Sequence, residues 1–553
     1  MRKFFLLIIP VLAMSCSFSR EEVDMIVHNA TIHSMDPSNT EFQAMAIKDG
    51  KLVELGAERS ILNRYKSVNK IDALKKDIYP GFIDAHCHFL GYGRTINEID
   101  LSNTNSFDEV LDMLSRKQSG VSSNWIIGRG WDQNDWENAE FPTKAKLDSM
   151  FSKNPVILTR VDGHTALVNQ IALQLSGIDE NTVVPGGQIL KENGELTGVL
   201  IDNAMLMVKE GIFESSNSQS QSALLKAQEA CFQVGLTTVS DAGLSVDEIK
   251  LIQQLQQKED LKMRVYAMVS DKEANFDYFL ENGPIKTDRL NVQSFKFYAD
   301  GTLGSRSACL MRPYSDSKET SGYLLDSLRY FRMRAEQLYN AGFQMNTHCI
   351  GDSANRAILG LYAEFLQPQN DRRWRIEHAQ VIAKQDRSMF SKFNIVPSVQ
   401  PTHATSDMYW AELRLGRNRI SRAYAYQSLK NELGWIALGT DFPVEGINPI
   451  HTFYAATVRK DENAYPKDGF QIEEKLTREE ALRGMTLWAA LSNFEENEKG
   501  SLEIGKFADF IMLDRDILTI SEDAILDTEV LLTVINGEIV FDRKASETSK
   551  IGS

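Results

Sequence analysis

The sequence predicts a closed barrel of eight parallel strands alternating with helices, a (β/α)8 or TIM barrel distorted by its additions. Three observations lead to this prediction. Strand-like and helical segments alternate over residues 78–441, both ends of the chain carry further short strands, and one connection is too long for a single helix. A chain of 553 residues is long enough for such a barrel with attached domains.

The first residues have the pattern of an export signal. Residues 1–3 include Arg2 and Lys3, and residues 4–12 form an apolar run too short to span a bilayer. The segment 1–16 resembles a bacterial lipoprotein signal peptide, in which Cys16 becomes the lipidated first residue. The alternatives are a secretory signal cleaved nearby and a cleavable helix with an incidental cysteine. We therefore expect an exported protein, held to a bacterial membrane by a lipid on Cys16 at its periplasmic or outer-surface face.

The composition limits the partners. A formal net charge of −16 and a pI near 5.2 argue against nucleic acid and anionic membrane surfaces. Four cysteines remain after the signal, too few for a disulfide framework in a chain of this size. We therefore expect a small molecule as partner, and an oligomer stays open.

Both ends of the chain consist of short strands and turns. Residues 23–27 and 44–47 are strand-like, as are residues 507–513 and 530–540 near the other end. Neither end is large enough to bury a core alone. We expect residues 23–79 and 500–545 to form one composite, β-sandwich-like domain.

The barrel itself is predicted for residues 80–499. Helical stretches such as 223–234 and 332–340 separate its strands, and each is followed by a glycine placed as a C-terminal stop. The predicted strands are residues 78–83, 236–240, 263–269, 292–298, 343–347, 374–377, 394–399 and 435–439.

One gap within the barrel is too long for a single crossover. It extends over residues 91–220 and contains aromatic and polar residues together at 129–136. An insertion after the first strand lies at the rim where barrel enzymes keep their sites, so we interpret it as a lid or substrate-pocket subdomain.

The first barrel strand runs into the sequence His86-Cys87-His88. Residues two apart on an extended backbone point to the same side, so both imidazoles can face one point while Cys87 faces away. Two such imidazoles form half of a site for zinc or a similar ion. Alone, the pair is more typical of two packed or solvated histidines than of a metal site.

Further polar residues stand at the ends of later strands. Only nine histidines occur in the chain, and four of them fall at these ends. In a parallel barrel all these ends meet at one rim, where the active site lies. The residues collected there are His86, His88, Lys296, His348, His378 and Asp441.

These positions lie within longer motifs that resemble the amidohydrolase superfamily, and within it the amidohydrolase-3 group that includes N-substituted formamide deformylases. The resemblance extends over residues 23–542, and the motifs occur in the family's order. They are residues 80–89, 160–169, 295–306, 348–352, 375–380, 400–403, 439–443 and 499–509.

The resemblance implies a site for one or two divalent ions, most simply zinc. His86, His88 and Asp441 would hold one ion, His348 and His378 a second, and Lys296, carboxylated by carbon dioxide, would bridge them. A metal-bound hydroxide would attack an amide-type carbonyl. Asp441 would take its proton and pass it to the departing nitrogen.

Three more residues are candidates beside the metals. The resemblance makes His164 and His403 candidates for stabilising the oxyanion or binding substrate, and Arg306 a candidate for binding substrate. A hydrogen-bonded scaffold role is the alternative for each. Asp300 and Asp352 are expected to brace loops, since each leads from a strand end into a glycine turn.

We therefore expect a metal-dependent hydrolase of a non-peptide carbon–nitrogen bond in a small molecule. A deacylase of N-acyl amino acids and a hydrolase of cyclic amides are alternatives on the same site. A non-catalytic lipoprotein that binds small molecules is the alternative of another class, although a complete set of metal ligands argues against it.

Overall fold

A computed structural model of the chain describes residues 20–96, 98–117, 125–212 and 217–551. Cys16 and the predicted signal peptide lie outside these residues. Within the described part, none of the helices combines the length and apolar character that crossing a membrane requires.

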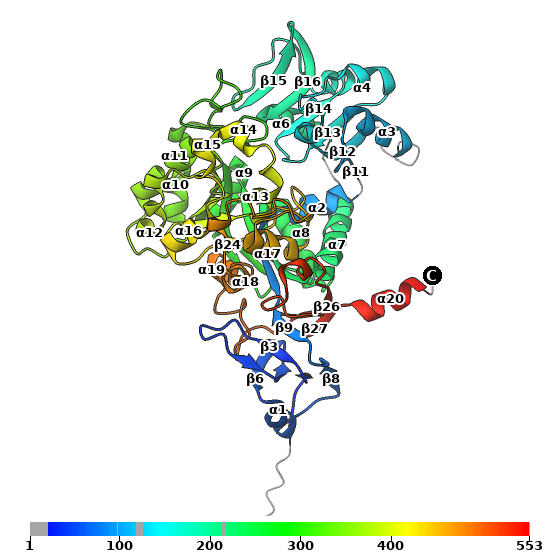
Figure 1. Ribbon diagram of the computed structural model, residues 1–553, viewed down its shortest axis with the longest axis vertical. Helices are drawn as coiled ribbons and strands as arrows, with labels where there is room; N and C mark the ends of the chain where they lie inside the picture. Colours follow the sequence, from blue (N-terminus) through cyan, green and yellow to red (C-terminus); the bar gives the residue numbers. More distant parts are fainter. Residues whose placement is uncertain (1–19, 97, 118–124, 213–216, 552–553) are drawn as a thin grey trace, which may run out of the picture.

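Eight parallel strands form the barrel, as predicted (Figure 1). Each pairs with the next along the chain, and the first and last ends are joined by two backbone hydrogen bonds of 2.8 Å, from His88 N to Phe442 O and from Asp441 N to His86 O. The strands in order are β10 (Phe82–Cys87), β17 (Leu236–Leu244), β18 (Arg264–Ser270), β20 (Leu290–Tyr298), β21 (Gln344–His348), β22 (Arg375–Glu377), β23 (Val396–Val399) and β24 (Ala437–Leu438).

Helices cover the outside of the barrel and return the chain to the start of each next strand. The predicted glycine stop is seen after α10, where Gly342 adopts a left-handed conformation with φ of 82°. The main helices are α7 (Asn217–Gln233), α8 (Val246–Gln257), α9 (Glu273–Asn282), α10 (Leu328–Ala341), α11 (Asp352–Phe365), α12 (Ser388–Phe393), α16 (Tyr426–Leu433), α17 (Pro449–Val458) and α18 (Arg478–Gly484).

The two chain ends form mixed sheets together. One sheet has the order β27-β26-β25-β9-β3-β4, so three strands from the C-terminal end join three from the N-terminal end through the β25–β9 pair, and a second, of N-terminal strands alone, has the order β6-β5-β2-β8. Their bounds are β2 (Met25–His28), β3 (Thr31–His33), β4 (Glu41–Phe42), β5 (Ala44–Lys48), β6 (Lys51–Gly56), β8 (Asn69–Asp72), β9 (Asp77–Pro80), β25 (Phe510–Leu513), β26 (Val530–Ile535) and β27 (Glu538–Asp542).

The segment 78–83, predicted as one strand, belongs to two sheets. β9 pairs with β25 in the terminal sheet, and β10 pairs with β17 in the barrel. Gly81 separates them, and a Cβ there would lie 2.3 Å from the Thr237 side chain. The chain changes sheets at Gly81 because only glycine fits so close to the neighbouring strand.

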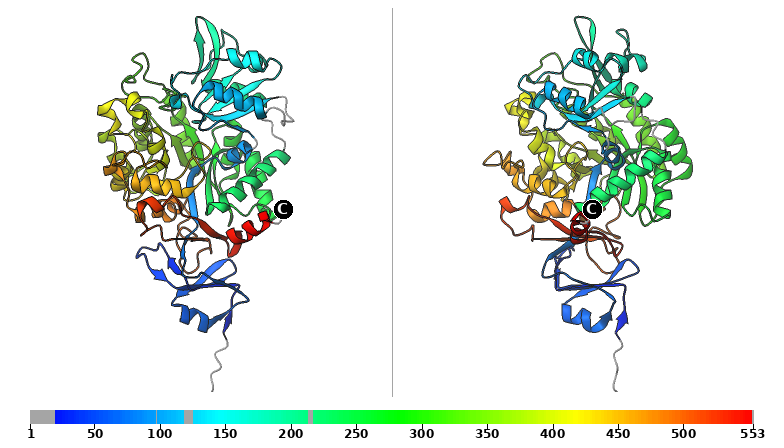
Figure 2. Two further views of the ribbon diagram at one scale, coloured as in Figure 1. Left: turned by 45° about the vertical axis from the view of Figure 1, so that its right-hand side comes forward. Right: turned by 90° about the vertical axis from the view of Figure 1, so that its right-hand side faces the viewer.

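The long insertion is a separate layer of sheet and helices. Its sheet has the order β11-β12-β13-β14-β16-β15, and it lies at the end of the barrel opposite the terminal sheets in all three views (Figures 1 and 2). Its strands and helices are β11 (Ile99–Asp100), α3 (Phe107–Lys117), β12 (Ile126–Trp131), α4 (Ala145–Met150), β13 (Val156–Arg160), β14 (Thr165–Val168), α5 (Gln170–Leu175), β15 (Gly187–Glu192), β16 (Glu195–Asp202) and α6 (Asn203–Ile212).

Candidate active site

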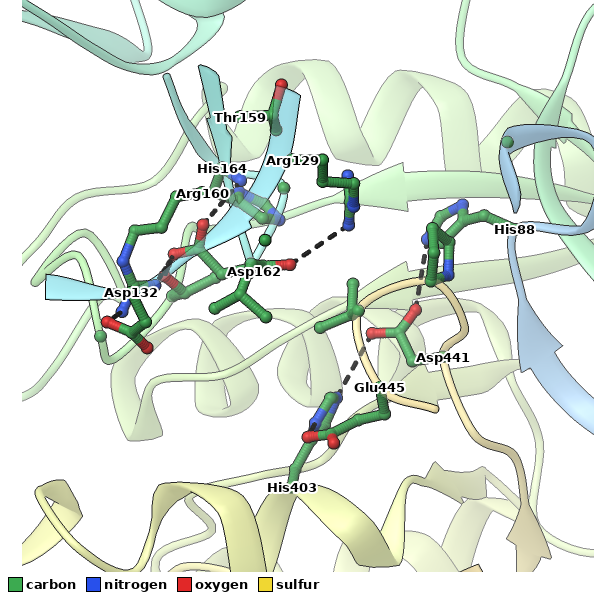
Figure 3. A pocket seen from close by; sticks show the side chains of 18 of the residues that line it. His88, Arg129, Asp132, Thr159, Arg160, Asp162, His164, His403, Asp441 and Glu445 are labelled. Carbon is green, nitrogen blue, oxygen red and sulfur yellow. Dashed lines mark hydrogen bonds and ion pairs between the residues drawn. The ribbon is translucent and has the colours of Figure 1, made fainter. Parts of the chain in front are cut away.

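A cavity of about 650 Å³ lies between the C-terminal ends of the barrel strands and the insertion. The barrel contributes His88, Lys296, His348, His378 and Asp441 to its lining. The insertion contributes charged residues from β12 and from the β13–β14 connection (Figure 3). Strand-end residues therefore meet the insertion across one cavity, as expected of a barrel active site.

His86 and His88 lie on one side of the first barrel strand. Glu377 Oε2 accepts from His86 Nδ1 at 2.6 Å, and the Ala242 carbonyl accepts from His88 Nδ1 at 3.0 Å. Because these oxygens can only accept, Nδ1 carries the proton in each neutral imidazole and Nε2 keeps its lone pair. Both histidines are thereby oriented as metal ligands.

Asp441 faces these lone pairs. Its Oδ1 lies 3.2 Å from His88 Nε2 and 3.6 Å from His86 Nε2, and this buried oxygen has no hydrogen-bond donor in the part of the chain that the structure describes. Nitrogen lone pairs and a carboxylate oxygen repel one another at this distance unless a positive ion lies between them. The ligand atoms of His86, His88 and Asp441 all lie within 4.8 Å of one another, so these three residues fit a divalent ion.

His348 and His378 lie beside this group. Their ring centroids are 4.6 Å apart, and that of His378 is 4.9 Å from His86. Gln400 Oε1 accepts from His378 Nδ1 at 2.7 Å, and His348 Nε2 is 3.3 Å from the Gly301 carbonyl. One ring nitrogen of each is thus held by the protein, and the other is available to a metal.

The protein keeps these buried imidazoles neutral. Burial and the charge of Lys296 lower the pKa of His86. Burial also lowers the pKa of His348 and that of His378 well below the usual value. The charge of a neighbouring histidine, His164 for His348 and His348 for His378, lowers each further. A neutral imidazole is the form that binds metal, so the site is prepared for an ion before one arrives.

Lys296 is buried in β20, with 1% of its surface exposed. Its Nζ lies 3.3 Å from His86 Nε2 and 4.4 Å from the centre of the Tyr298 ring. Among the described residues, no carboxylate comes within 4 Å of this amine. Asp300 is occupied elsewhere: it braces a loop, as predicted, by accepting from the backbone N–H groups of Ile350 and Gly351. Lys296 therefore has no ion-pair partner among the described residues of the barrel.

His403 lies on α13 (Pro401–Asp407) at the far side of Asp441. Its Nε2 is 3.3 Å from Asp441 Oδ2 and its Nδ1 is 2.9 Å from Glu445 Oε1. Although burial opposes it, hydrogen bonding to Asp441 and Glu445 raises the pKa of His403 well above its usual value. The same hydrogen bond from His403 outweighs the burial of Asp441 and holds the pKa of Asp441 well below its usual value.

His164 enters the cavity from the β13–β14 connection of the insertion. Asp202 Oδ1 lies 2.8 Å from its Nδ1, and its ring centroid is 5.1 Å from that of His348. Burial lowers the pKa of His164, but the hydrogen bond to Asp202 and the charge of Asp202 act against it, and the pKa is raised overall. The insertion thus places His164, with a raised pKa, next to the strand-end histidines.

Arg306 is absent from the described residues that line the cavity. Its Nη2 donates to Asp316 Oδ2 at 2.9 Å, and Asp316 also pairs with Arg414. This arrangement corresponds to the scaffold alternative, and contact with substrate stays a prediction for Arg306.

The residues that orient the candidate ligands were not singled out from the sequence. Asp84, whose pKa is raised to about 7 by burial, accepts from the backbone and hydroxyl of Thr440 and ties β10 to the loop of Asp441. Of these residues, only Glu377 and Asp84 could have been suspected from the sequence, because each lies within two residues of a candidate ligand. The orienting residues are Asp84, Asp202, Glu377, Gln400 and Glu445.

Two candidate ligands have an unusual backbone. His378 and Asp441 adopt φ angles of 69° and 64°, a region that non-glycine residues seldom enter. His378 N donates to Ser398 O and Asp441 N to His86 O, so neighbouring strands hold both residues in place. Strain of this kind is typical of functional positions.

Comparisons with known proteins agree with this geometry. The amidohydrolase family model matches residues 70–541. The chain is 32% identical over 544 residues to Protein LONG AFTER FAR-RED 3 of Arabidopsis thaliana, covering 94% of this chain and 91% of that protein. It is 24% identical over 550 residues to N-substituted formamide deformylase of Arthrobacter pascens, covering 95% and 99%.

Among solved structures, the fold is similar to that of an uncharacterized metal-dependent hydrolase from Pyrococcus horikoshii. The TM-score is 0.74 at 25% identity, and the match covers 90% of this chain and 99% of that one. The barrel, the convergent histidines and the family match lead to one conclusion. The chain belongs to the amidohydrolase family and is a metal-dependent hydrolase.

Proposed function

We propose that the protein hydrolyses a non-peptide, amide-type carbon–nitrogen bond in a small molecule, with one or two zinc ions held at the barrel rim. The observation that carries the proposal is the convergence of His86 Nε2, His88 Nε2 and Asp441 Oδ1, with acceptors on Nδ1 of both imidazoles. The likeness to N-substituted formamide deformylase supports the choice of bond. Nitrogen and carboxylate ligands in this number favour zinc.

Lys296 is proposed to carry a carboxyl group. Its neutral amine adds to carbon dioxide, so that a nitrogen–carbon bond forms and one proton leaves to solvent. The product is a carbamate whose single negative charge is shared by two oxygens, in place of a buried amine with no carboxylate within 4 Å among the described residues. With His348 and His378 nearby, this group completes the ligand set for a second ion.

A divalent ion held by these ligands would lower the pKa of water to near neutrality and polarise a carbonyl. Residues of the chain carry out the proton transfers and position the substrate. Asp441 accepts the proton of the attacking water and delivers it to the departing nitrogen, which would otherwise leave poorly as an anion. His403 holds Asp441 in place, and His164 points a donor into the same space for the oxygen of the substrate carbonyl.

Metal analysis followed by a substrate screen tests this function. The purified soluble domain is expected to contain about one or two zinc ions per chain and to hydrolyse members of a panel of formamides, N-acyl amino acids and cyclic amides. Chelation should abolish turnover, and added zinc should restore it. A protein that binds panel members tightly but does not cleave them when metal-loaded would instead be a binding protein.

Glu377 is expected to control metal affinity through His86. Glu377→Ala removes the acceptor that fixes the His86 tautomer, so the affinity for metal should fall about 10- to 100-fold. Competition with a chelator measures the change. Glu445→Ala is the matched control, because it removes the acceptor of His403, which is not among the proposed ligands. Equal metal affinity in both variants would remove Glu377 from this role.

A further inference from the structure

Arg129 lines the cavity and has no role in the proposed reaction. It lies on β12 of the insertion. Its Nη2 donates to the Val161 carbonyl at 3.2 Å, while its Nε is buried and has no hydrogen-bond partner among the described residues. A guanidinium has five N–H donors in a planar fork. Most of this fork is therefore free to bind another group.

The other arginines of the cavity wall are already neutralised. Arg94 pairs with Glu248 at 2.8 Å, and Arg160 pairs with both Asp132 and Asp162. Among the described residues, Arg129 has no carboxylate within 4 Å. It is thus the arginine in this lining that retains an uncompensated charge.

The acidic groups that act on Arg129 do so from a greater distance. They are Glu98, Asp162 and Asp441. Asp162 accepts from Ser305 and Thr302 and pairs with Arg160, and Asp441 accepts from His403. These two carboxylates are engaged elsewhere in the site.

The guanidinium is open toward the proposed metal ligands. Figure 3 shows Arg129 between Asp162 and His88, above the Asp441 carboxylate. A Cβ on Gly163 would lie 3.7 Å from its Nη2, so the glycine leaves this side of the fork uncovered. Leu206 and Tyr298, which also line the cavity, are 47% and 36% exposed and provide an apolar surface.

We propose that Arg129 binds a carboxylate of the substrate, so that the preferred substrates are amides that also carry a carboxyl group and an apolar side chain, as N-acyl amino acids do. This inference rests on the proposed hydrolysis at the same site. A planar fork with parallel N–H groups matches a carboxylate better than a single point charge does. The insertion thereby determines which amides the barrel cleaves.

The test compares two formamides that differ only in the carboxyl group, N-formylleucine and N-(3-methylbutyl)formamide. In the metal-loaded wild type the acid should have the higher kcat/KM. Arg129→Gln should lower kcat/KM for the acid about 10²-fold, as expected for charged hydrogen bonds, and change it less than about threefold for the neutral compound. Arg129→Lys, which keeps the charge but loses the fork, should restore only part of the preference.

Arg94→Gln is the matched control, because Arg94 lines the same cavity but pairs with Glu248, and it should leave the preference unchanged. Equal cleavage of both formamides by wild type and Arg129→Gln would overturn the role of Arg129 and leave the proposed hydrolysis intact.

Calorimetric binding of the same two compounds to the Asp441→Asn protein separates the remaining outcomes. Tighter binding of the acid that is lost with Arg129→Gln supports the carboxylate site even if no amide is cleaved. Binding of the acid that Arg129→Gln does not weaken, or no binding of the acid, overturns it.

Discussion

Replacing Lys296 by alanine is expected to remove at least one metal ion and most of the turnover. The side chain lies in β20 between Phe295 and Phe297, which are fully buried on the opposite face. Its amine has no carboxylate within 4 Å among the described residues and lies 3.3 Å from His86 Nε2. A free ammonium in this place would repel the metals, whereas a carbamate would hold them. The lysine is therefore expected to act only in its carboxylated form.

The experiment compares Lys296→Ala with Lys296→Met, which fills the space but cannot bind carbon dioxide. Metal content per chain and kcat are measured with and without added formate, acetate or propionate. Small carboxylates should restore part of the activity in the alanine protein, where there is room for them, and not in the methionine protein. Carbon-13 NMR with labelled bicarbonate should show a carbamate signal in the wild type alone. Full metal content and turnover in either variant would favour a site without a bridging lysine.

Asp441→Asn is expected to lower kcat by about 10²-fold or more, a typical contribution of a general acid–base group. The amide keeps an oxygen beside His88 and His86, so most of the metal should remain. It cannot accept and return a proton, because an amide oxygen is a very weak base. The loss should therefore appear in kcat more than in metal content.

The measurement pairs kcat with metal content for the best substrate of the screen. Glu445→Gln is a useful comparison, because Glu445 contacts the other nitrogen of His403 and touches Asp441 only through that ring. Its effect on kcat should be much smaller. Near-normal turnover in a metal-loaded Asp441→Asn protein would exclude Asp441 from proton transfer. Loss of the metal would show that Asp441 acts first as a ligand.

The barrel could be predicted because its signal is local and repeated. Each strand is an apolar segment followed by a helical one, and the eight predicted segments correspond to the eight barrel strands. The change of sheet at Gly81 was not predicted, since residues 78–83 form one apolar run in the sequence. Whether such a run stays in one sheet depends on its neighbours, here β25 and β17.

The candidate ligands could be identified from the sequence for a related reason. Parallel strands of a barrel end at the same rim, so residues far apart in the sequence share one place once the strands are recognised. The structure brings His88, Lys296, His348, His378 and Asp441 to one cavity, which His164 and His403 also line, with His86 buried next to Lys296 and His378. Arg306 follows a strand end by the same logic, yet its pairing with Asp316 is not visible in the sequence.

The sequence by itself determined the barrel, the terminal sheets and the set of strand-end residues, because periodicity and strand order are written along the chain. Only the tertiary structure decided which oxygen orients each imidazole, that no described carboxylate lies within 4 Å of Lys296, and that Arg129 of the insertion faces the cavity. These properties depend on distances of a few ångströms between residues such as His86 and Glu377, which are 291 positions apart. Packing of the barrel strands around one another, and of the insertion against the barrel, sets such distances, and no local pattern encodes them.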